Sequence, residues 1–316
     1  MKKIVFIAIV ALTVSFVTNS CSKDTNSNDP DDPTNVETYL TKEIIKKSSG
    51  TLYTMNSMYF YDNSKRLKKI VVEEITYSNS KSSYEVDFIY NTDGTLDKTI
   101  SSDGYVSIFR YINNKLSKVI ETGTDWNDTY NDTLYLYYDN SGQILKTTEF
   151  SYWSFSSGSV NKREEADEYE LNSNGRITQI KKTFKKYGNG ELDIHNMEII
   201  IYEYSSNGNL ISSNSVKTDI LTNEESWIKY QYEYDAKLNY WPTKHFPKEY
   251  LFIEMLYPDD VYSSNNTTLS TYTSSSGDYE ANIRNITNYN SNGYPITITA
   301  NWGSIELEYS QNISPK

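Results

Sequence analysis

Apolar and polar residues alternate along most of the chain, in runs separated by short polar turns. Tyr59 and Tyr61, for example, share one face of a run that ends at Asp62. Alternation over roughly 4–8 residues is typical of a strand with one buried face. Because such runs recur between residues 38 and 310, the pattern predicts a chain built of β-strands.

One unit repeats through this region. The units align on one pattern, in which an aromatic-x-Tyr sequence is followed by Asp or Asn, a short polar turn that often contains Gly, and then Leu or Ile. Asp and Asn side chains can bond the backbone two residues on, and Gly supplies the positive φ of tight hairpin loops. Each unit therefore predicts a β-hairpin. The units cover residues 59–70, 88–100, 109–120, 136–147, 169–180, 202–213, 232–238 and 287–298.

The connections between the units and the two ends of the region predict the architecture. Other polar connections, such as Gly123–Asn131 and Tyr187–Gly190, separate the units, so we expect an all-β antiparallel meander of about 16–18 strands. Leu40–Ile44 looks like the outgoing half of a unit, and Ile305–Ser310 like an incoming half. A sheet with complementary ends can pair its two edge strands. We expect a curved sheet or a closed barrel.

These residues resemble YD-type (RHS-like) repeats and, more closely, a family of uncharacterised Bacteroidetes outer-membrane lipoproteins with a porin-like fold. The contracted unit Tyr234–Asn239 and the later Ser264–Asn266 are also similar to that family. The resemblance covers most of residues 38–310 and is poorest over 240–263. It implies one porin-like β-domain, a domain of unknown function without a known activity.

A porin-like fold need not be a pore. A strand of a membrane barrel presents an apolar face to lipid. Residues 162–170 (KREEADEYE) and 177–186 (ITQIKKTFKK) instead carry charges on both faces of two predicted strands. We therefore expect a curved sheet or porin-like barrel that is not membrane-embedded, and an outer-membrane pore ranks third among the functions considered.

The first residues predict export. A basic start, Lys2-Lys3, precedes an apolar run from Ile4 to Val17 that is short for a bilayer span, and Cys21 follows as the single cysteine. This arrangement resembles a lipoprotein signal, in which the cysteine thiol carries lipid such as palmitate. An ordinary secretory signal is the alternative. The predicted organisation is a signal peptide over 1–20, an acidic flexible tether over 21–37, and a single β-repeat domain over 38–316 with an irregular insertion near 240–263.

The predicted location follows from this signal. Acidic residues after Cys21, such as Asp24 and Asp29, resemble those that favour export to the outer surface in such lipoproteins. We expect a lipid-anchored, surface-exposed protein of the outer membrane, with the periplasmic face as the alternative. The membrane is then a partner through the lipid on Cys21, and we expect a monomer.

Composition excludes several classes of protein. The net charge of −12 disfavours nucleic-acid binding. One Cys and two His exclude a disulfide framework and a Cys/His zinc cluster, so we expect no metal and no cofactor. No Gly-rich phosphate loop, HExxH, GxSxG or CxxC is present in the sequence. We predict no catalytic residue and a protein that is not an enzyme.

The alternative function is an extracytoplasmic hydrolase acting on glycans. His195 falls in a predicted strand and is read as a packed or surface imidazole, whereas His245, in the irregular insertion, is the better base. The acidic pairs Glu73/Glu74 and Glu164/Glu165 are adjacent in predicted strands. Adjacent strand residues point to opposite faces, so neither pair alone can flank one glycosidic bond.

Three tryptophans form the candidate binding site. Trp126, Trp153 and Trp302 fall in connections opposite the Tyr-Asp/Asn turns, and in a meander those connections share one rim. Tryptophan rings at such a rim can stack on sugars, anchor a protein partner or cover the end of a thin core. We expect a non-enzymatic binding or structural module with a glycan or protein ligand at this rim.

Overall fold

The structure is a computed structural model that describes residues 39–47, 53–76, 80–125, 128–154, 160–173, 176–188, 190–238, 265–292, 294–301 and 303–310. The regular elements in these ranges are all strands, and no helix there is long and apolar enough to cross a membrane. The strands are β1 (Tyr39–Lys47), β2 (Tyr53–Tyr61), β3 (Leu67–Ile75), β4 (Lys81–Tyr90), β5 (Leu96–Ser101), β6 (Val106–Ile112), β7 (Lys115–Asp125), β8 (Asp128–Tyr138), β9 (Ile144–Ser154), β10 (Val160–Leu171), β11 (Ile177–Gly188), β12 (Glu191–Tyr204), β13 (Leu210–Asp219), β14 (Glu225–Leu238), β15 (Asn265–Ser274), β16 (Tyr279–Tyr289), β17 (Pro295–Ala300) and β18 (Gly303–Ser310).

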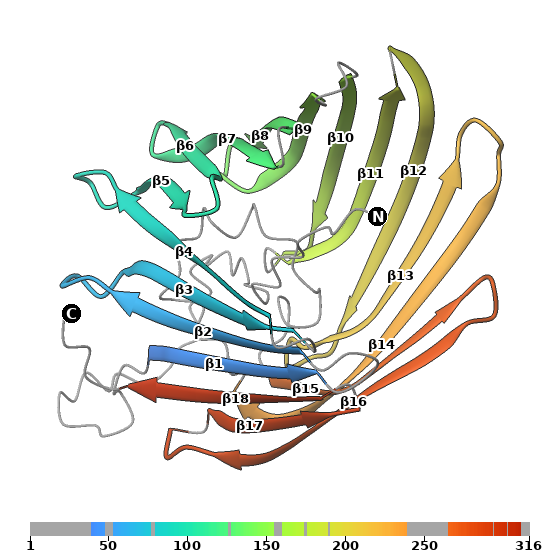
Figure 1. Ribbon diagram of the computed structural model, residues 1–316. Coiled ribbons are helices and arrows are strands. Elements are labelled where there is room, and N and C mark those ends of the chain that lie inside the picture. The colour runs from blue at the N-terminus through green and yellow to red at the C-terminus, as the bar shows by residue number, and fades with distance from the viewer. Residues whose placement is uncertain are drawn as a thin grey trace.

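The strands form one closed antiparallel barrel (Figure 1). Each strand pairs with the next one in sequence, and β18 pairs with β1 to complete an 18-stranded sheet. Of the two architectures expected, the open curved sheet is wrong, because the sheet closes into a barrel. The expected fold class is also wrong in placing the barrel outside the membrane, since closed barrels of this strand number are typically membrane-embedded.

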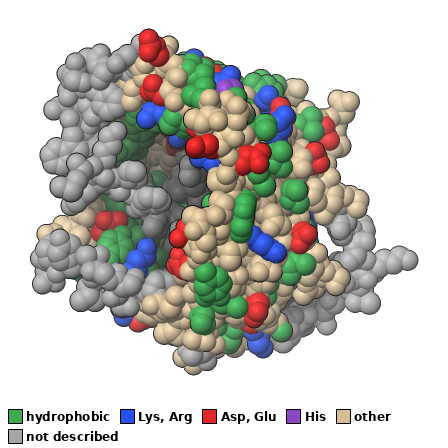
Figure 2. All heavy atoms as spheres, turned by 90° about the vertical axis from the view of Figure 1, so that its right-hand side faces the viewer, with side chains coloured by type: hydrophobic (Ala, Val, Ile, Leu, Met, Phe, Trp, Pro, Cys, Tyr) green, Lys and Arg blue, Asp and Glu red, His purple; other side chains and the backbone are tan. Residues whose placement is uncertain are grey.

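Closure changes how the charged strands are read. On β10, Arg163, Glu165 and Asp167 point into the barrel, where membrane barrels also carry polar side chains. Only the alternate residues, such as Lys162 and Glu164, face outward. Figure 2 shows the outer surface on the right-hand side of Figure 1, where hydrophobic side chains lie scattered among acidic and basic ones.

The repeated unit forms the turn that its residues predict. After β8, the Asp139 amide donates to the Gln143 carbonyl oxygen at 2.8 Å, and the Asp139 side chain accepts from the Gln143 amide at 2.8 Å. Gly142 has a φ of 90°, which suits glycine. The turn after β2 makes the same bonds with Asp62 and Arg66.

In five of the units the tyrosine hydroxyl bonds a main-chain carbonyl of the preceding half-unit or unit. At the end of β8, the Tyr138 hydroxyl donates to the carbonyl oxygen of Leu116, at the start of β7, at 2.8 Å. This bond closes the end of the strand pair where a bulge ends the regular ladder. The same bond joins Tyr61 to Leu40, Tyr90 to Leu67, Tyr111 to Leu96, and Tyr204 to Ile177.

The contracted unit near the end of β14 replaces this bond with a carboxylate. Tyr289 donates its hydroxyl to the Asp235 side chain. The other oxygen of Asp235 accepts from the Lys237 amide at 2.9 Å and from the Asn266 amide at 3.3 Å. A side chain thus stands in for the main-chain acceptor of the longer units.

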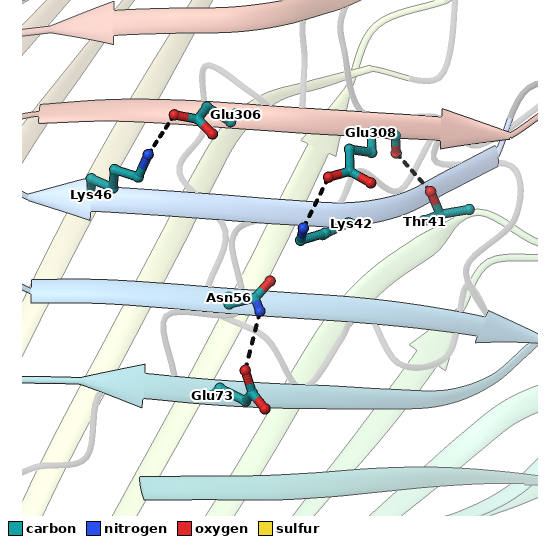
Figure 3. A network of polar contacts seen from close by, with 7 residues as sticks. All are labelled: Thr41, Lys42, Lys46, Asn56, Glu73, Glu306 and Glu308. Carbon is teal, nitrogen blue, oxygen red and sulfur yellow. Dashed lines mark hydrogen bonds and ion pairs between the residues drawn. The ribbon is translucent and has the colours of Figure 1, made fainter. Parts of the chain in front are cut away.

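The seam between β18 and β1 has an apolar inner side and a charged outer side. Inside, Ile45 and Ile305 lie opposite each other and are each 4% exposed. Outside, Lys42 pairs with Glu308 at 2.9 Å, and Lys46 pairs with Glu306 (Figure 3). Exposed ion pairs add little stability, so the buried isoleucines dominate the seam.

The interior has an apolar region and a polar region. Inward side chains of β1–β9, β17 and β18 pack into the main hydrophobic cluster, with Leu67 and Ile70 completely buried. A smaller cluster, which includes Leu210 and Tyr232, lies on β11–β14. Between these clusters, the inner faces of β7–β13 carry charged side chains. The candidate site described below lies in this polar region.

Candidate functional site

Trp153 is the one tryptophan of the predicted rim that lies within the described residues. It belongs to β9 itself, near the end of the strand, and is half-buried on the inner face opposite Tyr130 of β8. Trp126 and Trp302 lie outside the described residues, as do Cys21 and His245. The shared rim therefore stays a prediction, although strand directions put the ends of β7, β9 and β17 at one end of the barrel.

Trp153 belongs to an aromatic group at this end of the interior. The rings of Tyr130 and Tyr105, which precedes β6, are 5.2 Å apart between centroids. The guanidinium carbon of Arg163, from β10, lies 5.5 Å from the Trp153 ring centroid. This distance allows a cation–π contact that holds the indole in place.

Charged side chains continue the inner surface next to these rings. Arg163 donates to the Glu149 carboxylate, which also accepts from the Ser151 hydroxyl at 2.9 Å. On the next strand pair, Lys182 lies 3.5 Å from Asp167 and 4.0 Å from Glu165. We call this surface the inner wall. Its members are the aromatic residues Tyr105, Tyr130 and Trp153, and the charged residues Asp132, Glu149, Arg163, Glu165, Asp167 and Lys182.

Acidic residues of the inner wall oppose one another across strands. Asp132 is directly opposite Glu121, and Glu149 is directly opposite Glu165. Like charges in such positions destabilise a sheet unless a cation lies between them. Arg163 and Lys182 supply part of that compensation.

Burial changes how these groups titrate. Burial raises the pKa of Asp132 to about 6, with a smaller contribution from the Glu149 charge. Burial also raises the pKa of Glu165 and of Asp167. For Lys182, burial favours the neutral form, but the surrounding carboxylates, Asp167 first, raise its pKa on balance. The inner wall therefore loses negative charge as the pH falls toward mildly acidic values, because its carboxylates become protonated.

This arrangement offers groups that can bind a ligand rich in hydroxyls. Aromatic rings stack on the apolar faces of sugars. Carboxylates can accept hydrogen bonds from sugar hydroxyl groups, and a guanidinium can donate hydrogen bonds to them. Among the residues that the structure describes, no group of three His, Cys, Asp or Glu side chains is placed to hold a metal ion.

The other candidates from the sequence lie apart from the inner wall. His195 is on the outward face of β12, opposite Lys185. As predicted, the members of each acidic pair point in opposite directions. Glu74 accepts from the Tyr53 hydroxyl inside the barrel at 2.9 Å, whereas Glu73 accepts from Asn56 outside at 3.2 Å (Figure 3).

Sequence reasoning missed most of the inner wall. Tyr130, Asp132 and Glu149 were not singled out, and the segment 162–170 was read as solvent-exposed on both faces. The alternation in that segment contained the signal, because Arg163, Glu165 and Asp167 share one face. It could be interpreted only with the sheet closed, since closure makes that face an interior.

Comparisons with known proteins identify similar folds. No protein-family model matches the chain, and no curated protein matches it. Solved structures include a porin-like protein from Bacteroides vulgatus ATCC 8482, with 13% identity, a TM-score of 0.45, and coverage of 87% of this chain and 99% of that one. A second porin-like protein, from Bacteroides uniformis ATCC 8492, has 13% identity, a TM-score of 0.42, and coverage of 86% and 98%. At this identity the likeness concerns the fold alone.

Proposed function

We propose that the protein is a non-enzymatic binding barrel of the outer membrane that takes a glycan ligand against its inner wall. It is anchored by lipid on Cys21 and exposed at the cell surface. The observation that carries the proposal is the convergence of Trp153, Tyr130 and Arg163 on one inner surface, from three adjacent strands. Ring faces beside paired charges are the groups that a sugar, apolar on its faces and rich in hydroxyls, requires.

The decisive experiment compares two tryptophans on opposite sides of the sheet. The full chain, purified and probed on a glycan array, should bind particular oligosaccharides, and Trp153→Ala should weaken that binding by about tenfold or more. Trp227→Ala is the matched control, because Trp227 lies on the outward face of β14 and is 46% exposed. Equal losses in the two variants, or none in either, would refute binding at the inner wall.

The lipid anchor has its own test. Cys21 is the only thiol in the chain, so Cys21→Ser should abolish palmitate labelling and release the protein from the membrane fraction if the lipid is its anchor. Continued palmitate labelling would refute lipidation at Cys21. Loss of labelling with retention in the membrane would mean that the barrel holds itself there.

The second candidate function is an outer-membrane pore. The specific observation in its favour is the closed barrel of 18 strands, within the size range of barrels that enclose an aqueous channel. Single-channel conductance of the purified chain in planar bilayers distinguishes the two functions. Steps of current without glycan binding would favour the pore, and binding without current would favour the binding barrel.

A further inference from the structure

Three neighbouring strands, β5, β6 and β7, repeat one arrangement on their outward faces. Each presents a cation near the turn of a repeated unit and an isoleucine two residues farther from that turn. The pairs are Lys98 and Ile100 on β5, Arg110 and Ile108 on β6, and Lys118 and Ile120 on β7. The residues between the members of these pairs, Thr99, Phe109 and Val119, are buried on the inward face.

The order of cation and isoleucine matches the depth profile of a membrane. Outward side chains of an embedded barrel contact lipid, and an outward Lys or Arg costs about 2–4 kcal/mol at the bilayer midplane but about 0–1 near the interface. β7 begins at Lys115, so Lys118 lies about 10 Å along the strand from its end. The cations are therefore placed near the headgroups, and Ile108 and Ile120 are placed deeper, toward the hydrocarbon.

Two of these cations face each other. Arg110 and Lys118 are directly opposite on β6 and β7, an unfavourable like-charge pair that an anion between them would relieve. Arg110 reaches Asp97 at 3.3 Å, but no described carboxylate lies within ion-pair distance of Lys98 or Lys118. The Lys118 ammonium instead lies 5.1 Å from the ring centroid of Tyr135, on β8.

Neighbouring parts of the outer surface balance their cations. On β3, the outward Lys69 lies within ion-pair distance of Glu85 and Asp87. At the seam, each outward lysine pairs with a glutamate of β18. By contrast, none of the described side chains that point outward from β6–β9 is Asp or Glu. The surface around Arg110 and Lys118 is thus locally basic in a protein of net charge −12.

We propose that the outward face of β5–β7 holds a membrane lipid with an anionic phosphate headgroup. The phosphate lies between Arg110 and Lys118, where a guanidinium and an ammonium can both donate to its oxygens. The acyl chains lie along Ile108 and Ile120, and the Tyr135 ring flanks the headgroup, as tyrosine does at membrane interfaces. This site rests on the embedded barrel, and it is separate from the inner wall on the other face of the sheet.

The test measures lipid binding to the full chain, purified in a neutral detergent, by native mass spectrometry. Phosphatidylglycerol is compared with phosphatidylcholine of the same acyl chains, whose phosphate is neutralised by its own choline. We expect phosphatidylglycerol to bind about tenfold more tightly or better. Inorganic phosphate at equal concentration should not displace it, because the free ion has no acyl chains to lie against the isoleucines.

Two double variants locate the site. Arg110→Gln with Lys118→Gln should weaken phosphatidylglycerol binding by about tenfold. Lys42→Gln with Lys46→Gln is the matched control, because it also removes two outward positive charges, but from lysines that pair with glutamates at the seam. The control should bind phosphatidylglycerol as the wild type does.

Several results would overturn the proposal. Equal binding of the two lipids would mean that headgroup charge is not recognised, and displacement by inorganic phosphate would identify an ion site without a lipid. Unchanged binding in Arg110→Gln with Lys118→Gln, with the strand signal by circular dichroism intact, would place the site elsewhere. A chain that does not insert into phospholipid vesicles would refute this site but not glycan binding. Trp153→Ala should retain phosphatidylglycerol binding, which separates failure here from failure of the inner wall.

Discussion

At the scale of single residues, the thirty tyrosines explain how a chain with few aliphatic residues makes a barrel. A tyrosine ring can pack in a core while its hydroxyl reaches a polar partner at the edge. Tyr61 does both, being 4% exposed and bonded to the Leu40 carbonyl oxygen at 2.7 Å. Leucine in that place would fill the core but leave the carbonyl without its partner.

The first prediction tests this bond. Tyr138→Phe removes the hydroxyl that donates to the Leu116 carbonyl oxygen at 2.8 Å and keeps the ring. The free energy of unfolding in urea should fall by about 1 kcal/mol, the usual value of one hydrogen bond. Tyr137→Phe, one residue away on the exposed face, is the control and should change stability little. Equal effects in the two variants would argue against the role of the bond.

The second prediction concerns pH and Asp132. Its pKa is raised by burial to about 6 in the folded chain, above the ordinary value near 3.8, so folding takes up a proton. The stability from this uptake is full below about pH 4 and is lost as the pH rises through 6. Asp132→Asn lacks it, so the wild type should gain about 1 kcal/mol relative to the variant between pH 7.5 and 4.5, a figure reduced for partial exposure.

The matched control is Asp87→Asn, on the outward face of β4. Urea unfolding of the two variants and the wild type at both pH values checks the prediction. A difference between wild type and Asp132→Asn that does not depend on pH would contradict the raised pKa.

At the scale of elements, hairpins were more predictable than the contacts between them. The turn residues predicted each hairpin because Asp, Asn and Gly act locally, through bonds such as that between Asp139 and Gln143. The half-repeats at Leu40–Ile44 and Ile305–Ser310 pointed to a closing pair, now seen as β1 and β18. The partner of each tyrosine hydroxyl was not predictable, because periodicity gives the face of a residue but not what it bonds.

The third prediction separates the two sides of the seam. Ile305→Ala should lower the free energy of unfolding by about 2–4 kcal/mol, since it opens a cavity beside Ile45 in a buried position. Lys46→Ala and Glu306→Ala, which break an exposed ion pair, should each cost less than about 1 kcal/mol. Urea titrations give the free energy of unfolding for all three variants. A larger loss in Lys46→Ala or Glu306→Ala than in Ile305→Ala would show that the ion pair, and not the buried isoleucines, dominates the seam.

At the scale of the whole molecule, closure decides what each face of the sheet is for. In the sequence, residues 162–170 form a strand with charges on both faces. Once β18 pairs with β1 and the sheet closes, one of these faces lies in the interior and the other on the outer surface. The inner wall could not be predicted because its charges come from strands far apart in the sequence. Asp132 and Lys182, for example, are brought to one interior only by the barrel.

The fourth prediction tests closure directly. Ile44 and Glu306 are opposite each other across the seam, at a separation that suits a disulfide. Ile44→Cys with Glu306→Cys, in a chain that carries Cys21→Ser, should oxidise to a cross-link and migrate faster on a non-reducing gel. Pairing Ile44→Cys with Glu203→Cys, on β12, should give no such band. A barrel that stays open would give none in either variant.

The bond that joins the tyrosine of five units to the chain before it also sets an order of assembly. The Leu67 carbonyl oxygen gains its partner when Tyr90 arrives, 23 residues later, so a chain delivered from its N-terminus can seal one hairpin after another. β1 is different, because one of its sides waits for Gly303–Ser310, the last strand described. Until then that side is an open template for strands of other chains, and residues 39–47 need protection until the final hairpin arrives.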